Sequence, residues 1–166
     1  MAAFTYPRSE PGSAGHLDLV ERFNGFPSVL RAELTGVPED VLSRRPQDGA
    51  WSIKDILAHL CDDARIAHER LWKIINLEEP RLEPYDQEQL ARDRDAQSQS
   101  VNALLDEFAA QRTATVEMLT ELVHWNWARA GRHPEFGRMS IRQKVDRKIV
   151  HDETHLRQIR ELKAAG

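Results

Sequence analysis

Three histidines in this 166-residue chain have the residue type and spacing of a metal-binding site. His151 and His155 stand four residues apart in a segment with helical periodicity. Four residues advance a helix by about 6 Å and turn it by only about 40°, so both imidazoles project side by side and can bind one cation. His59 lies on the flank of the apolar stripe of an earlier segment, and it completes a three-histidine face if the two helices are neighbours.

The same spacing has a purely structural interpretation, in which His151 and His155 are hydrogen-bonded helix residues that are partly buried. Spacing alone gives the two interpretations equal weight. All three histidines lie at the edge of a core stripe rather than on a fully solvated face, and this position favours metal binding. Asp152 and Glu153 point elsewhere on the helix but add negative potential nearby.

Other polar side chains near His59 receive mainly structural interpretations. Cys61 lies about 200° around the helix from His59, which predicts a buried or half-buried, inert thiol. Asp62 and Asp63 can either orient an imidazole or face water, and the solvated interpretation is favoured. His68 can approach the bundle axis. It is assigned a surface, capping or packing role together with His16 in a flexible N-terminal region, His124 and His133.

Long segments with a 3.6-residue apolar period, joined by loops that contain proline, predict an all-α bundle with four main helices. The second, over about 52–76, begins at Ser52 with Asp55 at its third position. The first, over 17–34, contains Pro27, which predicts a kink or a restart. The third begins at Ser100, and the last begins at a capping box formed by Ser140 and Gln143.

Two short helices are predicted in the connections, one after Pro38 and one after Asp86. Residues 124–137 are predicted to be loop. The length fits a single domain over 1–166 with a flexible segment at 1–15. Four tryptophans are predicted to pack rather than to stack on bases: Trp51, Trp72, Trp125 and Trp127.

Composition excludes several classes of protein. Lys and Arg number 23 and Asp and Glu 27, so the formal charge of −4 argues against nucleic-acid binding. We find no apolar run long enough to cross a membrane and no apolar core of a secretory signal. The single cysteine, Cys61, cannot form an internal disulfide, which fits a reducing compartment. These features predict a soluble cytoplasmic protein.

Three blocks of the sequence resemble the DinB-like (YfiT-type) superfamily of four-helix bundles. Residues 49–60, with Trp51, Ser52, His59 and Leu60, are similar to a W-S-x-x-x-x-L-x-H-L signature. Residues 132–143 resemble the family's loop into the last helix, and residues 150–159 its H-D-x-x-H-L-x-Q-I ending. Many relatives carry an acidic residue where this chain has Ala64, which argues against a supporting role for that position.

The resemblance implies an up-down-down-up bundle in which His59, His151 and His155 hold a divalent ion, zinc or nickel foremost and iron or manganese as further options. It also implies a small-molecule substrate and a homodimer. Members of the family include bacillithiol and mycothiol S-transferases, and others are described as metal-dependent hydrolases. The leading hypothesis is a thiol S-transferase in detoxification or stress response that uses a low-molecular-weight thiol. A hydrolase with the same site and a non-catalytic metal-binding or stress-associated bundle are the alternatives.

Overall fold

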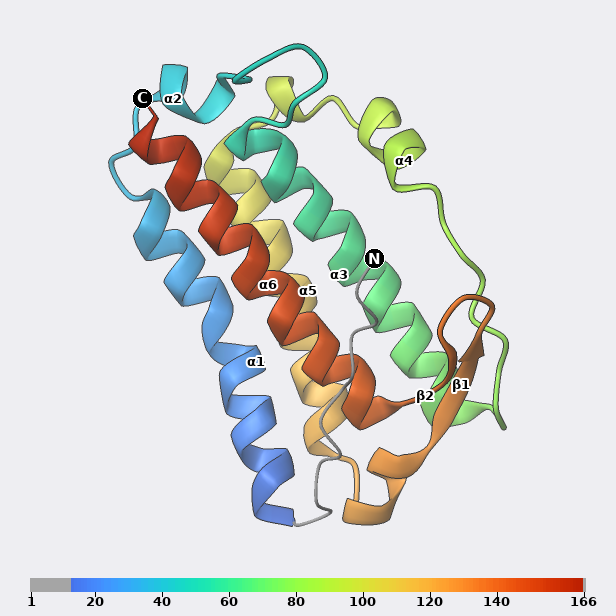
Figure 1. Ribbon diagram of the computed structural model, residues 1–166. Coiled ribbons are helices and arrows are strands. Elements are labelled where there is room, and N and C mark those ends of the chain that lie inside the picture. Colours follow the sequence, from blue (N-terminus) through green and yellow to red (C-terminus); the bar gives the residue numbers. More distant parts are fainter. Residues whose placement is uncertain (1–12, 166) are drawn as a thin grey trace.

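The computed structural model describes residues 13–165, and four long helices form a bundle in it (Figure 1). They are α1 (Ser13–Leu34), α3 (Ile53–Asn76), α5 (Val101–Thr120) and α6 (Ile141–Ala164). Helices α1 and α6 run in one direction and α3 and α5 in the other, so the predicted up-down-down-up topology is confirmed (Figure 1). Helix α3 packs against both α5 and α6, which brings the two segments that carry the candidate ligands together.

The predicted helix starts are confirmed because polar caps satisfy backbone donors that a helix end leaves free. The Ser52 side chain accepts from the Asp55 backbone and the Asp55 side chain accepts from the Ser52 backbone, which forms a capping box. Ser140 and Gln143 form the second capping box at the start of α6. Ser100 caps α5 through the backbone nitrogen of Ala103.

Helix α1 differs from its prediction at two points. It begins at Ser13 rather than near residue 17, so the part of the predicted flexible segment at 13–15 is helical, and residues 1–12 lie outside the described residues. It also continues through Pro27 as one helix, so of the two predicted alternatives the restart is wrong. A proline removes one backbone hydrogen bond, and burial of Phe23, Phe26 and Leu30 on the two turns around it holds the helix together.

Short elements fill the connections between the long helices. The predicted turns of helix are present as α2 (Glu39–Ser43), which joins α1 to α3, and α4 (Gln87–Asp93), which caps on Asp86. Helix α4 and the 3-10 turn η1 (Ala96–Ser98) belong to a long crossover that returns outside the bundle to the start of α5 (Figure 1). A second 3-10 turn, η2 (His124–Ala128), follows α5.

A β-hairpin forms in a region that the sequence predicted to be loop. Strands β1 (Ala130–His133) and β2 (Gly137–Ser140) pair antiparallel, and Gly137 takes the positive φ of 70° that the turn requires. The backbone of Arg132 bonds to Pro80 and to Leu82, so the hairpin also holds the first part of the crossover. Alternation of apolar and polar residues over four-residue strands is too short a signal to distinguish a strand from a loop.

The core consists of two clusters of buried apolar side chains. One lies near the start of α3 around Leu57 and Phe108, and the other near its end around Leu71 and Ile141. Cys61 is fully buried, and its thiol donates to the carbonyl of Leu104, as predicted for an inert thiol. Among the described residues, none of the helices combines the length and hydropathy that a membrane crossing requires.

Candidate metal centre

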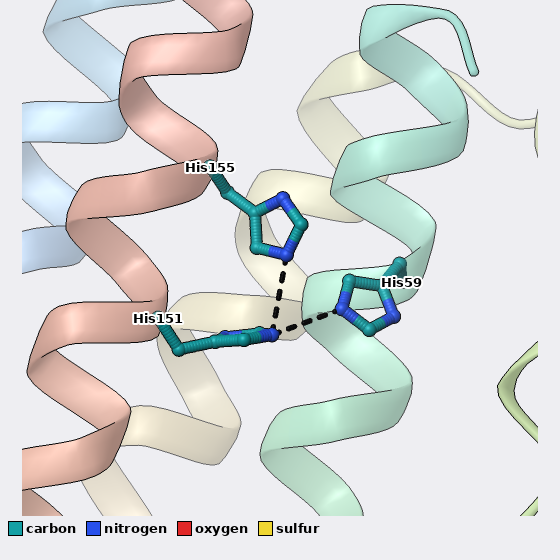
Figure 2. A group of neighbouring side chains, drawn as sticks. All are labelled: His59, His151 and His155. Carbon is teal, nitrogen blue, oxygen red and sulfur yellow. Dashed lines mark hydrogen bonds between the residues drawn. The ribbon is translucent and has the colours of Figure 1, made fainter. Parts of the chain in front are cut away.

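The three candidate histidines meet between α3 and α6 (Figure 2). Nε2 of His151 lies 3.1 Å from Nε2 of His59 and 3.2 Å from Nε2 of His155. One ligand atom from each residue lies within 4.8 Å of the others, as one ion bound by all three requires. The expectation that the two histidines of the last helix project side by side is met, with ring centroids 4.5 Å apart.

Burial keeps the three imidazoles neutral, which is the form that binds a metal. Burial is the main cause that lowers the pKa of His59 to about 4, and a proton on the neighbouring His155 would oppose protonation of His59 as well. Burial also lowers the pKa of His151 to about 3. The pKa of His155 is lowered by burial as well, although its hydrogen bond to Gln158 acts in the opposite direction.

The neighbours of two rings leave their Nε2 lone pairs free. Nδ1 of His155 lies 2.7 Å from Oε1 of Gln158, an acceptor, so this nitrogen carries the ring proton and Nε2 presents a lone pair. Nδ1 of His151 faces an oxygen of Asp63 at 3.6 Å, and the carboxylate favours a proton on that nitrogen as well. Two lone pairs that face each other at 3.2 Å repel, and a cation between them removes the repulsion.

The geometry of the cluster therefore fits a transition-metal ion. Bonds of about 2.0–2.1 Å with angles between octahedral and tetrahedral values separate two ligand nitrogens by about 2.8–3.4 Å. The observed separations of 3.1 and 3.2 Å lie in that range. Three neutral imidazoles form a borderline-soft donor set suited to zinc, nickel, iron or copper.

Asp63 corrects the favoured interpretation of the two aspartates after His59. Its carboxylate is buried, accepts from the hydroxyl of Tyr85 at 3.0 Å and pairs with the ammonium of Lys148 at 2.5 Å. Burial acts to raise the pKa of Asp63, but the charge and hydrogen bond of Lys148 outweigh it and hold this pKa well below its usual range. Asp63 thus faces His151 rather than water, whereas Asp62 pairs with Arg94 at 2.9 Å.

The remaining histidines lie outside the cluster, as predicted. His68 bonds to the hydroxyl of Thr115 on α5 at 2.9 Å. His16 is buried and its ring stacks on Trp127, so the predicted flexible position is wrong for this residue and the packing role is right. His124 lies beside His16, and Nδ1 of His133 accepts from backbone nitrogens within its hairpin turn.

Of the four tryptophans, two pack as predicted and two do not. Trp127 is buried, and Trp51 packs on the core with its ring 5.1 Å from that of His59. Trp72 and Trp125 are exposed at 50 % and 72 % of their surface.

A cavity of about 310 Å³ adjoins the cluster at His151, and its cationic lining was missed by the sequence analysis. Lys144 and Lys148 of α6 line it. A signal was present, because Lys144, Lys148, His151 and His155 follow the 4-3-4 spacing that places residues on one helix face.

Comparison with known proteins agrees with this bundle topology and with the cluster of three histidines between α3 and α6. A family model described as the DinB superfamily matches residues 22–159. The match covers most of the chain, and the protein belongs to the DinB superfamily.

Relatives of similar length include proteins named for metal-dependent chemistry. The chain is 24% identical over 143 residues to "Putative metal-dependent hydrolase OB0782" of Oceanobacillus iheyensis, a match that covers 86% of this chain and 83% of that protein. It is 28% identical over 152 residues to the uncharacterized protein YuaE of Bacillus subtilis, covering 79% of this chain and 88% of YuaE.

A solved structure has the same fold. YfiT from Bacillus subtilis, described as "a probable metal-dependent hydrolase with an unusual four-helix bundle topology", matches with a TM-score of 0.88. The match covers 99% of this chain and 94% of YfiT at 18% sequence identity. At that identity the likeness establishes the fold.

Proposed function

We propose that the protein is a metal-dependent enzyme acting on a small molecule, in which His59, His151 and His155 hold one divalent ion. The convergence of three neutral Nε2 atoms from two helices carries the proposal. Zinc or nickel suits the three imidazoles best, and iron or manganese are the further options. Three protein ligands leave at least one coordination position for a reactant, which is the pattern of catalytic rather than structural sites.

Such an ion supplies Lewis acidity and lowers the pKa of a bound water or thiol, which generates a nucleophile near neutral pH. The residues of this chain orient the histidines that would hold the ion. Asp63 keeps the His151 ring turned with Nε2 toward the cluster, and Gln158 does the same for His155. The adjoining cavity gives the second reactant a place beside His151.

The leading reaction is transfer of a low-molecular-weight thiol to an electrophile, in detoxification or stress response. The sequence blocks that resemble a family with thiol S-transferases support it. Hydrolysis with water as the nucleophile is the second candidate, and the names of relatives such as OB0782 and YfiT favour it. The two reactions share the site and differ only in the nucleophile.

Metal content and turnover test this proposal together. Elemental analysis of the purified protein is expected to find about one divalent ion per chain. Protein that is stripped and reloaded with single metals is then assayed with a panel of thiols and monochlorobimane, and with ester and amide substrates. Turnover that requires metal supports an enzyme, and the panel that responds identifies the nucleophile.

Two histidines of α3 provide matched variants. His59→Gln is expected to abolish metal retention and turnover, whereas His68→Gln, which lies outside the cluster, is expected to keep both. Metal binding without turnover on any panel would instead identify a non-catalytic metal-binding bundle. Failure to load any divalent ion would overturn the proposal.

A single domain over 1–166, a homodimer and a cytoplasmic location remain proposals of the same kind. The exposed rings of Trp72 and Trp125 are consistent with association between copies. Size-exclusion chromatography with light scattering is expected to give twice the chain mass, and a monomer at all concentrations would exclude the dimer.

A further inference from the structure

The cavity beside His151 contains a buried amine for which the described structure provides no carboxylate partner. Lys144 of α6 is only 6 % exposed and lines the cavity. Among residues 13–165 its ammonium has no carboxylate within ion-pair distance. A mostly buried lysine without a carboxylate beside it leaves its positive charge at the wall of the cavity.

Two arginines of the same cavity also lack carboxylate partners among the described residues. The guanidinium of Arg147 lies 3.8 Å from the centroid of the Phe136 ring, and that of Arg70 lies 5.3 Å from the Tyr85 ring. Arg70 also donates to the backbone carbonyl of Glu83. These contacts hold the guanidinium groups in place and leave their positive charges uncompensated.

The lining is therefore cationic in a protein whose formal charge is −4. Four cationic side chains face two carboxylates, a net of two positive charges: Arg70, Lys144, Arg147 and Lys148 against Asp63 and Glu135. The Asp63 carboxylate is already engaged by Lys148 and Tyr85. Burial and the charges of Lys148 and Arg70 together lower the pKa of Lys144 to about 7, although the Asp63 carboxylate acts in the opposite direction.

We propose that this cavity is an anion subsite in which Lys144, Arg147 and Arg70 bind a carboxylate or phosphate group of a reactant. The inference rests on the proposed function, because it names the class of molecule that the three-histidine site acts on. The bound anion supplies the missing partner of Lys144 and places the rest of the molecule beside His151. A cavity of about 310 Å³ holds a metabolite-sized anion and no macromolecule.

Calorimetric titration of the full-length protein with malonate and with inorganic phosphate tests the subsite directly. The titrations are run on metal-free and on zinc-loaded protein, at low ionic strength and at a pH of about 6, where Lys144 is protonated. We expect one anion to bind per chain in both forms of the protein. Comparison of the two probes shows whether the subsite prefers a carboxylate or a phosphate.

Lys144→Met removes the charge and keeps the length of the side chain, and it is expected to weaken anion binding by about tenfold or more. Arg157→Met is the matched control, because it removes one charge from an exposed position of α6 outside the cavity lining, and we expect a change of less than about twofold. Zinc retention by both variants shows that they are folded.

The outcomes separate this inference from the proposed function. Binding of neither anion, or equal binding by the wild type and Lys144→Met, overturns the anion subsite while leaving zinc binding and turnover to decide the function. Anion binding that is retained by His155→Gln after the loss of zinc supports the subsite independently of the metal. Anion binding by a protein that loads no divalent ion would support the anion subsite and overturn the proposed metal-dependent function.

Discussion

His151 and Asp152 are consecutive residues of α6, and they belong to two buried polar clusters of opposite character. His151 joins the three-histidine cluster at α3. Asp152, about 100° further around the helix, pairs with Arg112 of α5 at 2.9 Å. Both clusters lie within an apolar interior. They differ in whether residues of the protein supply the partners of each polar group.

The ion pair obtains its partners from within the bundle. Arg112 and Asp152 are each about 96 % buried, and the guanidinium also donates to the backbone carbonyl of Phe23 at 2.7 Å. The Arg112 guanidinium lies 3.8 Å from the centroid of the Phe23 ring. The counter-charge of each group and the packing around the guanidinium are thus supplied by residues of the protein, which is typical of a structural element.

The histidine cluster lacks such closure. Its three Nε2 atoms face one another, and within the described residues Nδ1 of His151 has Asp63 near it but no hydrogen bond. The adjoining cavity is lined by Lys144, whose ammonium has no ion pair within residues 13–165. The comparison teaches that a buried charge with its counter-charge inside the protein indicates stability, and that lone pairs directed at one another beside a cavity indicate a ligand.

The largest expected effect comes from breaking the ion pair. Arg112→Met leaves the Asp152 carboxylate buried without a counter-charge, and we expect the free energy of unfolding to fall by about 3–5 kcal/mol. Urea unfolding followed by circular dichroism measures it. The double variant Arg112→Met with Asp152→Leu is expected to recover most of the loss, and a single-variant loss below about 1 kcal/mol would contradict the structural role.

The histidine cluster is expected to respond to an added ion instead. Zinc at about 100 times its dissociation constant raises the free energy of unfolding by about 2.7 kcal/mol if it binds only the folded chain. His155→Gln is expected to lose this gain, and Arg22→Gln, a substitution at a surface pair, is expected to keep it. Thermal or urea unfolding with and without zinc gives the result, and an equal gain in His155→Gln would exclude His155 as a ligand.

In metal-free protein the cluster is expected to make stability depend on pH. The pKa of His59 is lowered to about 4 and that of His151 to about 3, so the unfolded chain binds more protons than the folded one below its histidine pKa of 6.5. This contribution is complete above about pH 6.5 and falls as the pH drops toward 4, by about 1–2 kcal/mol per histidine at pH 5.

Unfolding free energies at pH about 7 and about 5 measure this dependence. The difference between the two values is expected to shrink in the variant His59→Gln with His151→Gln. Full retention of the wild-type difference would show that these rings are not buried in the neutral form.

The smallest effect is expected one residue beyond Asp152. Glu153 pairs with Arg22 at 3.2 Å, and both side chains are more than half exposed. Glu153→Gln is expected to change the free energy of unfolding by less than about 0.5 kcal/mol, because solvent screens exposed pairs. A loss of unfolding free energy comparable to that of Arg112→Met would mean that solvent exposure does not explain the different contributions of Asp152 and Glu153 to stability.

Local sequence signals determined the helices and the three candidate ligands. Capping at Ser52, Ser100 and Ser140 depends on residues within one turn, so each helix start is encoded locally. The four-residue spacing of His151 and His155 follows from helix geometry in the same way. His59 was a candidate from its position at the edge of an apolar stripe, and the resemblance of the surrounding sequence blocks to a known family supported the three ligands and implied the order of the helices.

Only the tertiary structure decided which polar groups meet across helices. Asp63 faces His151, 88 positions later, and Arg112 pairs with Asp152, although neither pair has a local signature. Burial of α1 residues kept the helix continuous through Pro27, against the local preference of proline. The helix period determines on which face of a helix a side chain lies, whereas the packing of the helices determines which residues that face contacts. The cavity lined by Lys144 follows from that packing.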